Sequence, residues 1–238
     1  MGPRIADIDI TVLAGGLGTR LQKVLPDTPK ILAPQRGQPF LEHLLRWLSS
    51  QGARRVLLAL GYRAEGVLAY LESRSFTSLR VETIVEPEPL GTGGAVAFAR
   101  AHLNSDPVMV VNGDTIVDAD LNAFLASHQA SGAEASILCA EVKNAGRYGR
   151  VEIDAASRVR RFEEKDPGST GTHWINAGFY LFRRTVLDRI ASLRKGSLEH
   201  DILEKMPPGS LHAFRTRGRF LDIGTPETLA VAPEVLPP

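Results

Sequence analysis

The sequence predicts an α/β fold in which helices flank a mainly parallel sheet. In the first half of the chain, short apolar runs alternate with segments whose apolar residues recur at helical spacing. Strands that alternate with helices are joined by right-handed crossovers, so their carboxyl ends meet along one edge of the sheet. Ligands of open α/β sheets bind at such an edge, and we expect the functional site there.

The first half carries the parallel part of the expected sheet. Apolar residues from Phe40 to Leu48 recur every three or four positions, which predicts a helix that ends at Gly52. Asp118 is the expected N-cap of the last helix in this half. Expected strands span residues 8–14, 56–60, 81–86 and 108–112, and expected helices span 38–51, 64–73, 93–103 and 119–130.

The second half has shorter, turn-rich segments, which indicate a mixed part of the sheet and a small β excursion. Expected strands span 135–142, 149–153, 159–162 and 176–182, and expected helices span 184–193 and 197–205. Thr225 is expected to cap a helix that begins at Pro226, and the Pro-rich tail 233–238 is expected to fray. No long linker divides the chain, so we expect one domain over 1–238 with two halves, 1–130 and 131–232.

Composition excludes several classes of protein. The 28 basic and 27 acidic residues give a net charge of +1, which offers no broad attraction to nucleic acid or to an anionic membrane. No signal peptide and no apolar stretch of about 20 residues is visible, so a cytoplasmic location is expected. The single cysteine, Cys139, stands in an apolar run and is interpreted as a buried core thiol.

The stretch from Leu13 to Leu21 is the most informative part of the sequence. It reads Leu-Ala-Gly-Gly-Leu-Gly-Thr-Arg-Leu, so a buried strand opens into a glycine loop that can bring backbone N–H groups close to an anion. Arg20 and Lys30 supply cations for a phosphate chain. The loop matches neither a Walker A sequence nor a dinucleotide fingerprint, whose third glycine position holds Leu21. A tight turn without a ligand is the alternative.

Three further places at expected strand ends carry candidate ligands. A glycine-rich turn, 90–95, opens a helix and suits a base or a phosphate, although close helix–strand packing explains it equally well. Asp114 follows a strand and is either a Mg²⁺ ligand or a turn residue that bonds its own backbone. Asp222 lies in a short apolar stretch, where a metal would explain an otherwise costly charge.

A last group suits a sugar phosphate. Glu163, Glu164 and Lys165 follow one expected strand, and Asn176 and Gly178 lie at the start of another. They offer hydroxyl acceptors, a cation and close backbone access, whereas a solvated charge cluster is the alternative. None of the six histidines shows metal-ligand or triad spacing, and Gly-x-Ser-x-Gly is absent.

The order of these motifs resembles that of sugar-1-phosphate nucleotidyltransferases over roughly residues 8–229. Within that family, 148–151, 162–165 and 222–227 look most like the D-glycero-α-D-manno-heptose 1-phosphate guanylyltransferases. The resemblance implies a Rossmann-like, GT-A-like fold. It also implies transfer of a nucleotidyl group, with GTP expected as donor, to a sugar 1-phosphate, with release of pyrophosphate. The product would be a nucleotide sugar for cell-surface polysaccharide synthesis.

The resemblance also implies roles for individual residues. Arg20 and Lys30 would neutralise the reacting phosphates, and Asp114 and Asp222 would hold Mg²⁺ as the cofactor. Residues in the positions that cradle nucleotide are Ala14, Gly15, Gly16, Gly18, Thr19, Glu86, Gly91, Thr92 and Gly94. Residues in the positions that grip the sugar phosphate are Asn112, Gly149, Glu164, Lys165, Asn176 and Gly178.

Several alternatives stay open at this point. Thymidylyl, uridylyl or cytidylyl transfer to a hexose or amino-sugar 1-phosphate would use the same set of residues. A non-catalytic regulatory subunit that binds nucleotide sugar has less use for Arg20, Lys30, Asp114 and Asp222 together. An NAD-dependent enzyme is disfavoured by the interrupted glycine pattern. The oligomeric state is open, with a homodimer allowed.

Overall fold

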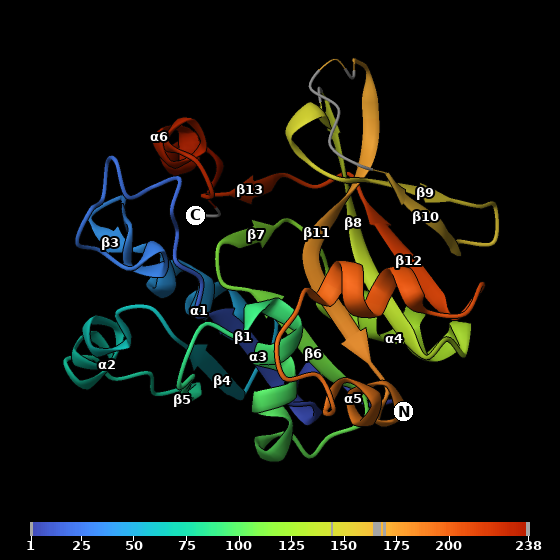
Figure 1. The fold of residues 1–238 in the computed structure, drawn as a ribbon, viewed down its shortest axis with the longest axis horizontal. Coiled ribbons are helices and arrows are strands. Elements are labelled where there is room, and N and C mark those ends of the chain that lie inside the picture. The colour runs from blue at the N-terminus through green and yellow to red at the C-terminus, as the bar shows by residue number, and fades with distance from the viewer. Residues whose placement is uncertain (1, 144, 164–167, 169, 237–238) are drawn as a thin grey trace.

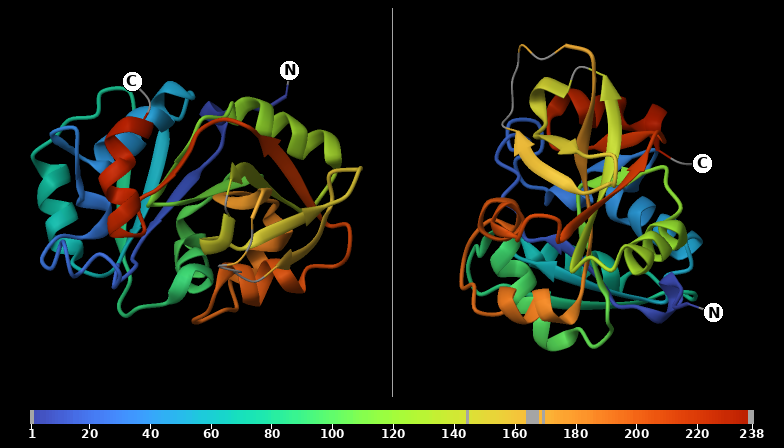
Figure 2. Two further views of the ribbon diagram at one scale, coloured as in Figure 1. Left: turned by 90° about the horizontal axis from the view of Figure 1, so that it is seen from above. Right: turned by 90° about the vertical axis from the view of Figure 1, so that its right-hand side faces the viewer.

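A computed structural model describes residues 2–143, 145–163, 168 and 170–236 of the chain. It confirms the expected α/β fold. In the described residues, nine strands form one mixed sheet whose main path is β10-β9-β11-β6-β1-β4-β5, and β8 and β12 extend it from β11 (Figure 1). The two halves of the chain lie side by side, blue to green against yellow to orange (Figures 1 and 2).

The elements have the following bounds. The strands are β1 (Ile10–Ala14), β2 (Pro34–Gln35), β3 (Gln38–Pro39), β4 (Arg55–Leu60), β5 (Arg80–Val85), β6 (Val108–Asn112), β7 (Thr115–Val117), β8 (Ala135–Lys143), β9 (Arg150–Ile153), β10 (Val159–Glu163), β11 (Thr172–Phe182), β12 (Leu211–Thr216) and β13 (Phe220–Asp222). The longer helices are α1 (Phe40–Ser50), α2 (Ala64–Glu72), α3 (Gly91–Ala99), α4 (Leu121–Ser131), α5 (Arg184–Ile190) and α6 (Pro226–Val235).

The centre of the sheet is parallel, as predicted. β1 lies between β4 and β6, and Leu13 is opposite both Ala59 and Asn112. The strand ends at Ala14, Leu60 and Asn112 therefore meet at one edge. β11 then pairs antiparallel with β6, so the direction of the strands reverses beside Asn112.

Alternate residues of the strands feed two hydrophobic cores, one on each face of the sheet. Val56 and Leu58 of β4 belong to the core that α1 and α4 cover, whereas Leu57 belongs to the core that α3 and α5 cover. Burial on both faces is expected for parallel strands. Cys139 of β8 is fully buried, which confirms the prediction of a core thiol, and burial raises its pKa.

Three helices begin at other residues than predicted. α1 begins at Phe40, two residues after the expected start, because Gln38–Pro39 forms β3. The N-cap of α4 is Asp120, whose carboxylate accepts hydrogen bonds from the backbone N–H of Asn122 and Ala123, and the expected cap at Asp118 is wrong. The backbone N–H of Asp118 instead donates to the Arg219 carbonyl at 2.8 Å, because Asp118 follows β7 where the chain runs beside β13. α3 begins at Gly91, which has a φ of +72°.

The second half differs more. β12 pairs in parallel with β8, and no strand was expected there. The helix expected over 197–205 is a π-helical turn, Leu198–Ile202, followed by a 3-10 turn, Leu203–Lys205. The Ser197 hydroxyl caps the first turn, and the two turns meet at Ile202, whose φ of −117° departs from a regular helix. Gly178 breaks the register of β11 with β8 between Asn176 and Tyr180.

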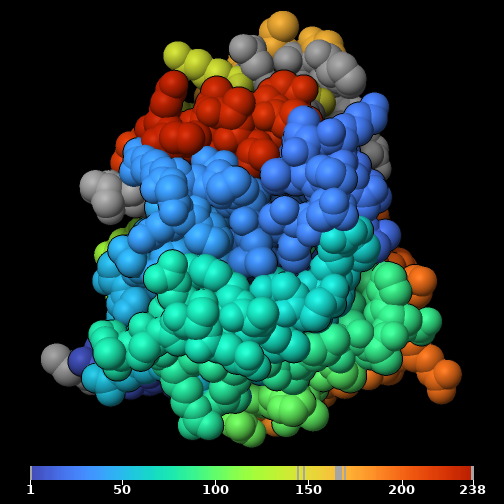
Figure 3. Space-filling view, turned by 90° about the vertical axis from the view of Figure 1, so that its left-hand side faces the viewer, coloured from blue at the N-terminus to red at the C-terminus, as the bar shows by residue number. Residues whose placement is uncertain are grey.

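The C-terminal helix returns to the N-terminal half. Thr225 caps α6 and Pro226 is its first residue, as predicted, but the helix continues through Pro233 to Val235 instead of fraying there. Arg36 donates to the Pro233 carbonyl at 2.6 Å and so helps to hold this last turn. In Figure 3, α6 (red) lies against the blue N-terminal segment. Residues 237–238 of the expected tail lie outside the described residues. Among the helices in the described ranges, none has the length and apolar character required to span a membrane.

Candidate active site

A pocket of about 470 Å³ lies at the carboxyl ends of the parallel strands, where the topology predicts a site. Its walls come from the loop after β1, the segment after β5, the start of α3, the turn between β6 and β7, and the approach to α6. The lining residues that were predicted as site residues are Ala14, Gly15, Gly16, Gly18, Thr19, Arg20, Lys30, Glu86, Gly91, Thr92, Asn112 and Asp114. Leu17, Pro89 and Gly224 also line it and were not predicted.

The glycine loop is tied to the neighbouring strands. The Gly15 carbonyl accepts a hydrogen bond from the Tyr62 N–H at 3.2 Å, and the Leu13 carbonyl accepts one from the Gly113 N–H at 2.9 Å. Farther along, Arg63 donates to the Asp27 carbonyl at 2.7 Å and so anchors the segment that leads to Lys30. The loop thereby passes across the strand ends and presents its backbone to the pocket.

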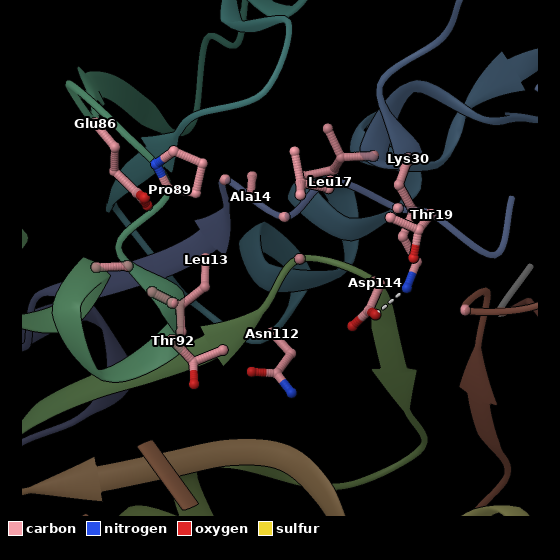
Figure 4. A pocket seen from close by; sticks show the side chains of 18 of the residues that line it. Leu13, Ala14, Leu17, Thr19, Lys30, Glu86, Pro89, Thr92, Asn112 and Asp114 are labelled. Carbon is pink, nitrogen blue, oxygen red and sulfur yellow. Dashed lines mark hydrogen bonds and ion pairs between the residues drawn. The ribbon is translucent and has the colours of Figure 1, made fainter. Parts of the chain in front are cut away.

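Glu86 lies at one end of the pocket, far from Lys30 and Asp114 at the other end (Figure 4). Its side chain is buried, and its Oε2 accepts a hydrogen bond from the Leu90 N–H at 3.2 Å. Burial raises the pKa of Glu86. A Cβ on Gly15 would stand 2.5 Å from Glu86 Oε1, so only glycine leaves room for this carboxyl.

The other end of the pocket is built around Lys30 and Asp114. Lys30 begins a short 3-10 helix, Lys30–Leu32, and its ammonium forms an ion pair with the Asp114 carboxylate (Figure 4). Asp114 follows β6 in the turn that leads into β7. Arg20 is exposed on the pocket wall. Lys30 and Arg20 are thus two cations on the pocket wall that can contact an anionic chain, and Lys30 is paired with a carboxylate.

Asp222 joins Asp114 from a distant part of the sequence. It ends β13, which pairs antiparallel with β7, and the Ile223 N–H donates to the Asp114 carbonyl at 3.0 Å. A Cβ on Gly224 would stand 2.7 Å from Asp222 Oδ1 and 3.2 Å from Lys30 Nζ. The pairing of β7 with β13 thus places both aspartates and Lys30 in one small region.

The two aspartates fit a Mg²⁺ ion that is also bound by substrate. In the part of the chain that the structure describes, no group of three or more His, Cys, Asp or Glu side chains could hold a metal. Mg²⁺ is commonly bound by one or two carboxylates, with substrate phosphates and water as its remaining ligands. Asp114 and Asp222 are therefore the residues that would hold it.

The glycines of the turn 90–95 serve packing more than ligand access. A Cβ on Gly91 would be 2.5 Å from the Gly196 carbonyl oxygen, and one on Gly94 would be 2.9 Å from the Arg194 carbonyl oxygen. The Gly93 N–H donates to the Gly196 carbonyl, also at 2.9 Å. Gly91 and Thr92 still line the pocket, whereas Gly94 is buried behind the described residues that form the pocket wall.

The predicted sugar-phosphate residues are divided between the pocket and its surroundings. Asn112 lines the pocket, and the nearby Gly178 has a φ of +79° and leaves space for the Asn112 side chain. Asn176 lies one step farther out and accepts a hydrogen bond from the Gly178 N–H at 3.0 Å. Gly149 lies just before β9, and a Cβ at this position would be 3.5 Å from the Glu163 carbonyl oxygen. Glu164 and Lys165 lie outside the described residues.

A polar network that the sequence did not suggest supports this side of the site. The Asn176 amide donates to the Tyr180 hydroxyl at 2.8 Å and to Glu199 Oε1 at 2.5 Å. Tyr180 is fully buried, and burial together with the Glu199 charge raises its pKa. Glu199 comes from the π-helical turn, which had been interpreted only as part of a helix, and no local pattern in the sequence pairs it with Asn176.

Comparisons with known proteins show the family to which the chain belongs. The family model for nucleotidyl transferases matches residues 10–236. The mannose-1-phosphate guanylyltransferase of Mycobacterium tuberculosis is 35% identical over 225 residues, which are 92% of this chain and 62% of that protein. The chain thus spans less than two thirds of that relative. The D-glycero-alpha-D-manno-heptose 1-phosphate guanylyltransferase of Aneurinibacillus thermoaerophilus is 34% identical, over 92% of this chain and 94% of its own length.

Solved structures give the same result. The crystal structure of HddC from Yersinia pseudotuberculosis superposes with a TM-score of 0.87 and 36% identity, and the match covers 95% of this chain and 98% of that one. The structure of the same protein complexed with GMP-PN has a TM-score of 0.86.

Proposed function

Because the chain is an enzyme of the nucleotidyl transferase family, we propose that it transfers a guanylyl group from GTP to a sugar 1-phosphate and releases pyrophosphate. The observation that carries this proposal is that one pocket has the buried carboxyl of Glu86 at one end and the Lys30 ammonium, paired with Asp114, at the other, with Arg20 also on its wall. A nucleoside triphosphate has the matching polarity, with hydrogen-bond donors on its base and negative charge on its phosphates.

The choice of GTP rests on Glu86. An ionised carboxylate only accepts hydrogen bonds. Guanine presents two adjacent donors, N1–H and N2–H, which such a carboxylate accepts as a pair. Uracil and thymine present one N–H flanked by carbonyl oxygens, and these oxygens would repel the carboxylate. The relatives named as guanylyltransferases support the same choice.

The reaction needs positioning and charge neutralisation but no covalent enzyme intermediate. The sugar 1-phosphate oxygen attacks the α-phosphorus of GTP in line with the departing pyrophosphate. Arg20 neutralises the leaving group, and Lys30 neutralises the reacting phosphates. Mg²⁺ held by Asp114 and Asp222 would supply further charge neutralisation at the phosphate oxygens. Asn112, Asn176 and Gly178 orient the sugar phosphate, so that 1–130 acts mainly on nucleotide and 131–232 mainly on sugar.

For the acceptor we favour D-glycero-α-D-manno-heptose 1-phosphate over mannose 1-phosphate. The segments 148–151, 162–165 and 222–227 look most like those of the heptose enzymes. The heptose enzyme of Aneurinibacillus thermoaerophilus is 34% identical to this chain, and the mannose enzyme of Mycobacterium tuberculosis is 35% identical. The two identities are nearly equal, so an experiment decides between them.

The proposal is tested by measuring pyrophosphate release with four NTPs and with heptose, mannose and glucose 1-phosphates. We expect the highest kcat/KM for GTP with the heptose phosphate. A clear preference for another NTP would refute the base assignment, and a preference for mannose 1-phosphate would refute only the acceptor assignment.

The matched variant is Glu86→Gln, which keeps the shape of the side chain but removes its charge. We expect kcat/KM for GTP to fall by about 10- to 100-fold, as for the loss of a charged hydrogen bond. The variant should retain the far-UV circular dichroism of the wild type. Unchanged discrimination between GTP and UTP in this variant would show that Glu86 does not select the base.

A further inference from the structure

We propose that the Lys30 ammonium is a placeholder for the divalent cation: it neutralises Asp114 while the site holds no substrate, and it releases this carboxylate when cation and nucleotide enter. The inference rests on the proposed function, because it concerns the same site. It assigns Lys30 a role before substrate binds, as the partner of Asp114, in addition to its contact with phosphate.

The position of the ammonium carries the first step of the argument. Lys30 Nζ pairs directly with Asp114 Oδ2 (Figure 4). It also lies 3.2 Å from the point where a Cβ on Gly224 would stand, and Asp222 Oδ1 lies 2.7 Å from that point. The ammonium is therefore paired with one of the two carboxylates that would hold the metal and lies in the same small region as the other.

The surroundings strengthen the pairing. The side chains of Lys30 and Asp114 are only 20% and 30% exposed, so their attraction is screened less than that of a surface pair. Two aspartates brought together by β7 and β13 repel each other unless a cation lies nearby. The Lys30 ammonium supplies that charge without a metal.

Lys30 and the metal compete for the same oxygen. Asp114 Oδ2 is occupied by the ammonium, and a metal that used it would place two positive charges in contact. The flexible four-carbon stem of lysine allows the ammonium to leave. Lys30 lines the pocket, so once displaced it can turn to the phosphates of a nucleotide bound there. The site then favours a metal that arrives with nucleotide. The phosphates supply further ligands to the metal and pair with the ammonium that leaves Asp114.

The test measures cation binding by the complete protein without nucleotide. Mn²⁺ is titrated and followed by electron paramagnetic resonance in the wild type and in Lys30→Met. We expect the variant to bind Mn²⁺ about tenfold more tightly or better, since a nearby positive charge is removed. Lys205→Met is the matched control, because Lys205 pairs with Asp201 at 3.0 Å outside the site, and its Mn²⁺ affinity should equal that of the wild type. Asp114→Asn should weaken binding.

Equal or weaker Mn²⁺ binding by Lys30→Met, repeated with Lys30→Gln, would overturn the proposal. Thermal melts show whether each variant is folded, and a larger stabilisation of Lys30→Met than of the wild type by Mn²⁺ is a second expected result. The proposed function fails separately, if the wild type releases no pyrophosphate with any NTP. The Mn²⁺ titration needs no turnover and decides the placeholder role in either case.

Discussion

Replacing Gly178 by alanine tests how the sugar side of the site is held against the sheet. Gly178 has a φ of +79°, which costs an L-residue about 1–2 kcal/mol. The new Cβ would also stand 2.7 Å from Asn112 Nδ2 and 2.9 Å from Asn112 Cβ. Asn112 ends β6, a central strand that cannot retreat, so overpacking adds about 1–3 kcal/mol. Gly178→Ala should therefore destabilise the protein by about 2–5 kcal/mol.

Urea denaturation separates the two contributions. Gly132→Ala is the control, because Gly132 has a similar φ of +65° but no atom within 4 Å of the added Cβ. It should lose only about 1–2 kcal/mol. Asn112→Ala removes Cγ and Nδ2 but keeps the Cβ that lies 2.9 Å from the new methyl, so in that background Gly178→Ala should cost less than in the wild type but still more than Gly132→Ala. The reasoning is refuted if Gly178→Ala costs no more than Gly132→Ala, or if the Asn112→Ala background leaves its cost unchanged.

Two further stability changes follow from particular contacts. Gly15→Ala should destabilise the protein by about 1 kcal/mol, because its Cβ would displace the Glu86 carboxyl from the Leu90 N–H. A Cβ on Gly16 would have no atom within 4 Å, so Gly16→Ala should change the free energy of unfolding by no more than about 0.5 kcal/mol in the same urea assay. Equal losses of stability in Gly15→Ala and Gly16→Ala would contradict this. Burial lowers the pKa of His128 from 6.5 to about 4, so the unfolded chain takes up the proton first. The stabilisation from neutral His128 is complete above pH 6.5 and is about 2 kcal/mol smaller at pH 5. The urea midpoints of the wild type and His128→Gln should therefore converge as the pH falls from 6.5 to 5. A constant difference between the two midpoints would contradict this.

Local patterns were sufficient for much of the fold. The parallel strands β1, β4 and β6 are continuous apolar runs, and their shared edge follows from the handedness of crossovers. The Thr225 cap and Pro226 start of α6 are signals within two adjacent residues. The glycine loop after β1 could be assigned to the site because its position depends only on the end of one strand.

Features that depend on distant partners could not be predicted. β12 pairs with β8, which precedes it by a long stretch of chain, and nothing within Leu211–Thr216 indicates that partner. The role of Glu199 could not be predicted either, because only the fold brings its carboxylate to the Asn176 amide. Asp118 and Asp120 are both reasonable N-caps in sequence, and the pairing of β7 with β13 decides between them by occupying the backbone of Asp118.

The glycine-rich turn shows that one motif can serve close packing and line the pocket at the same time. Glycine at 91, 93 and 94 allows α3 to approach the backbone of 193–197, and the Thr92 hydroxyl accepts a hydrogen bond from the Leu198 N–H at 2.8 Å. The next residue, Glu199, holds Asn176 on the sugar side. The segment after α5 therefore touches the proposed nucleotide wall at Gly91 and Thr92 and the proposed sugar side at Asn176. A substitution that repositions Glu199 would also move the support of Gly91 and Thr92, so acceptor and nucleotide binding by this chain should not vary independently.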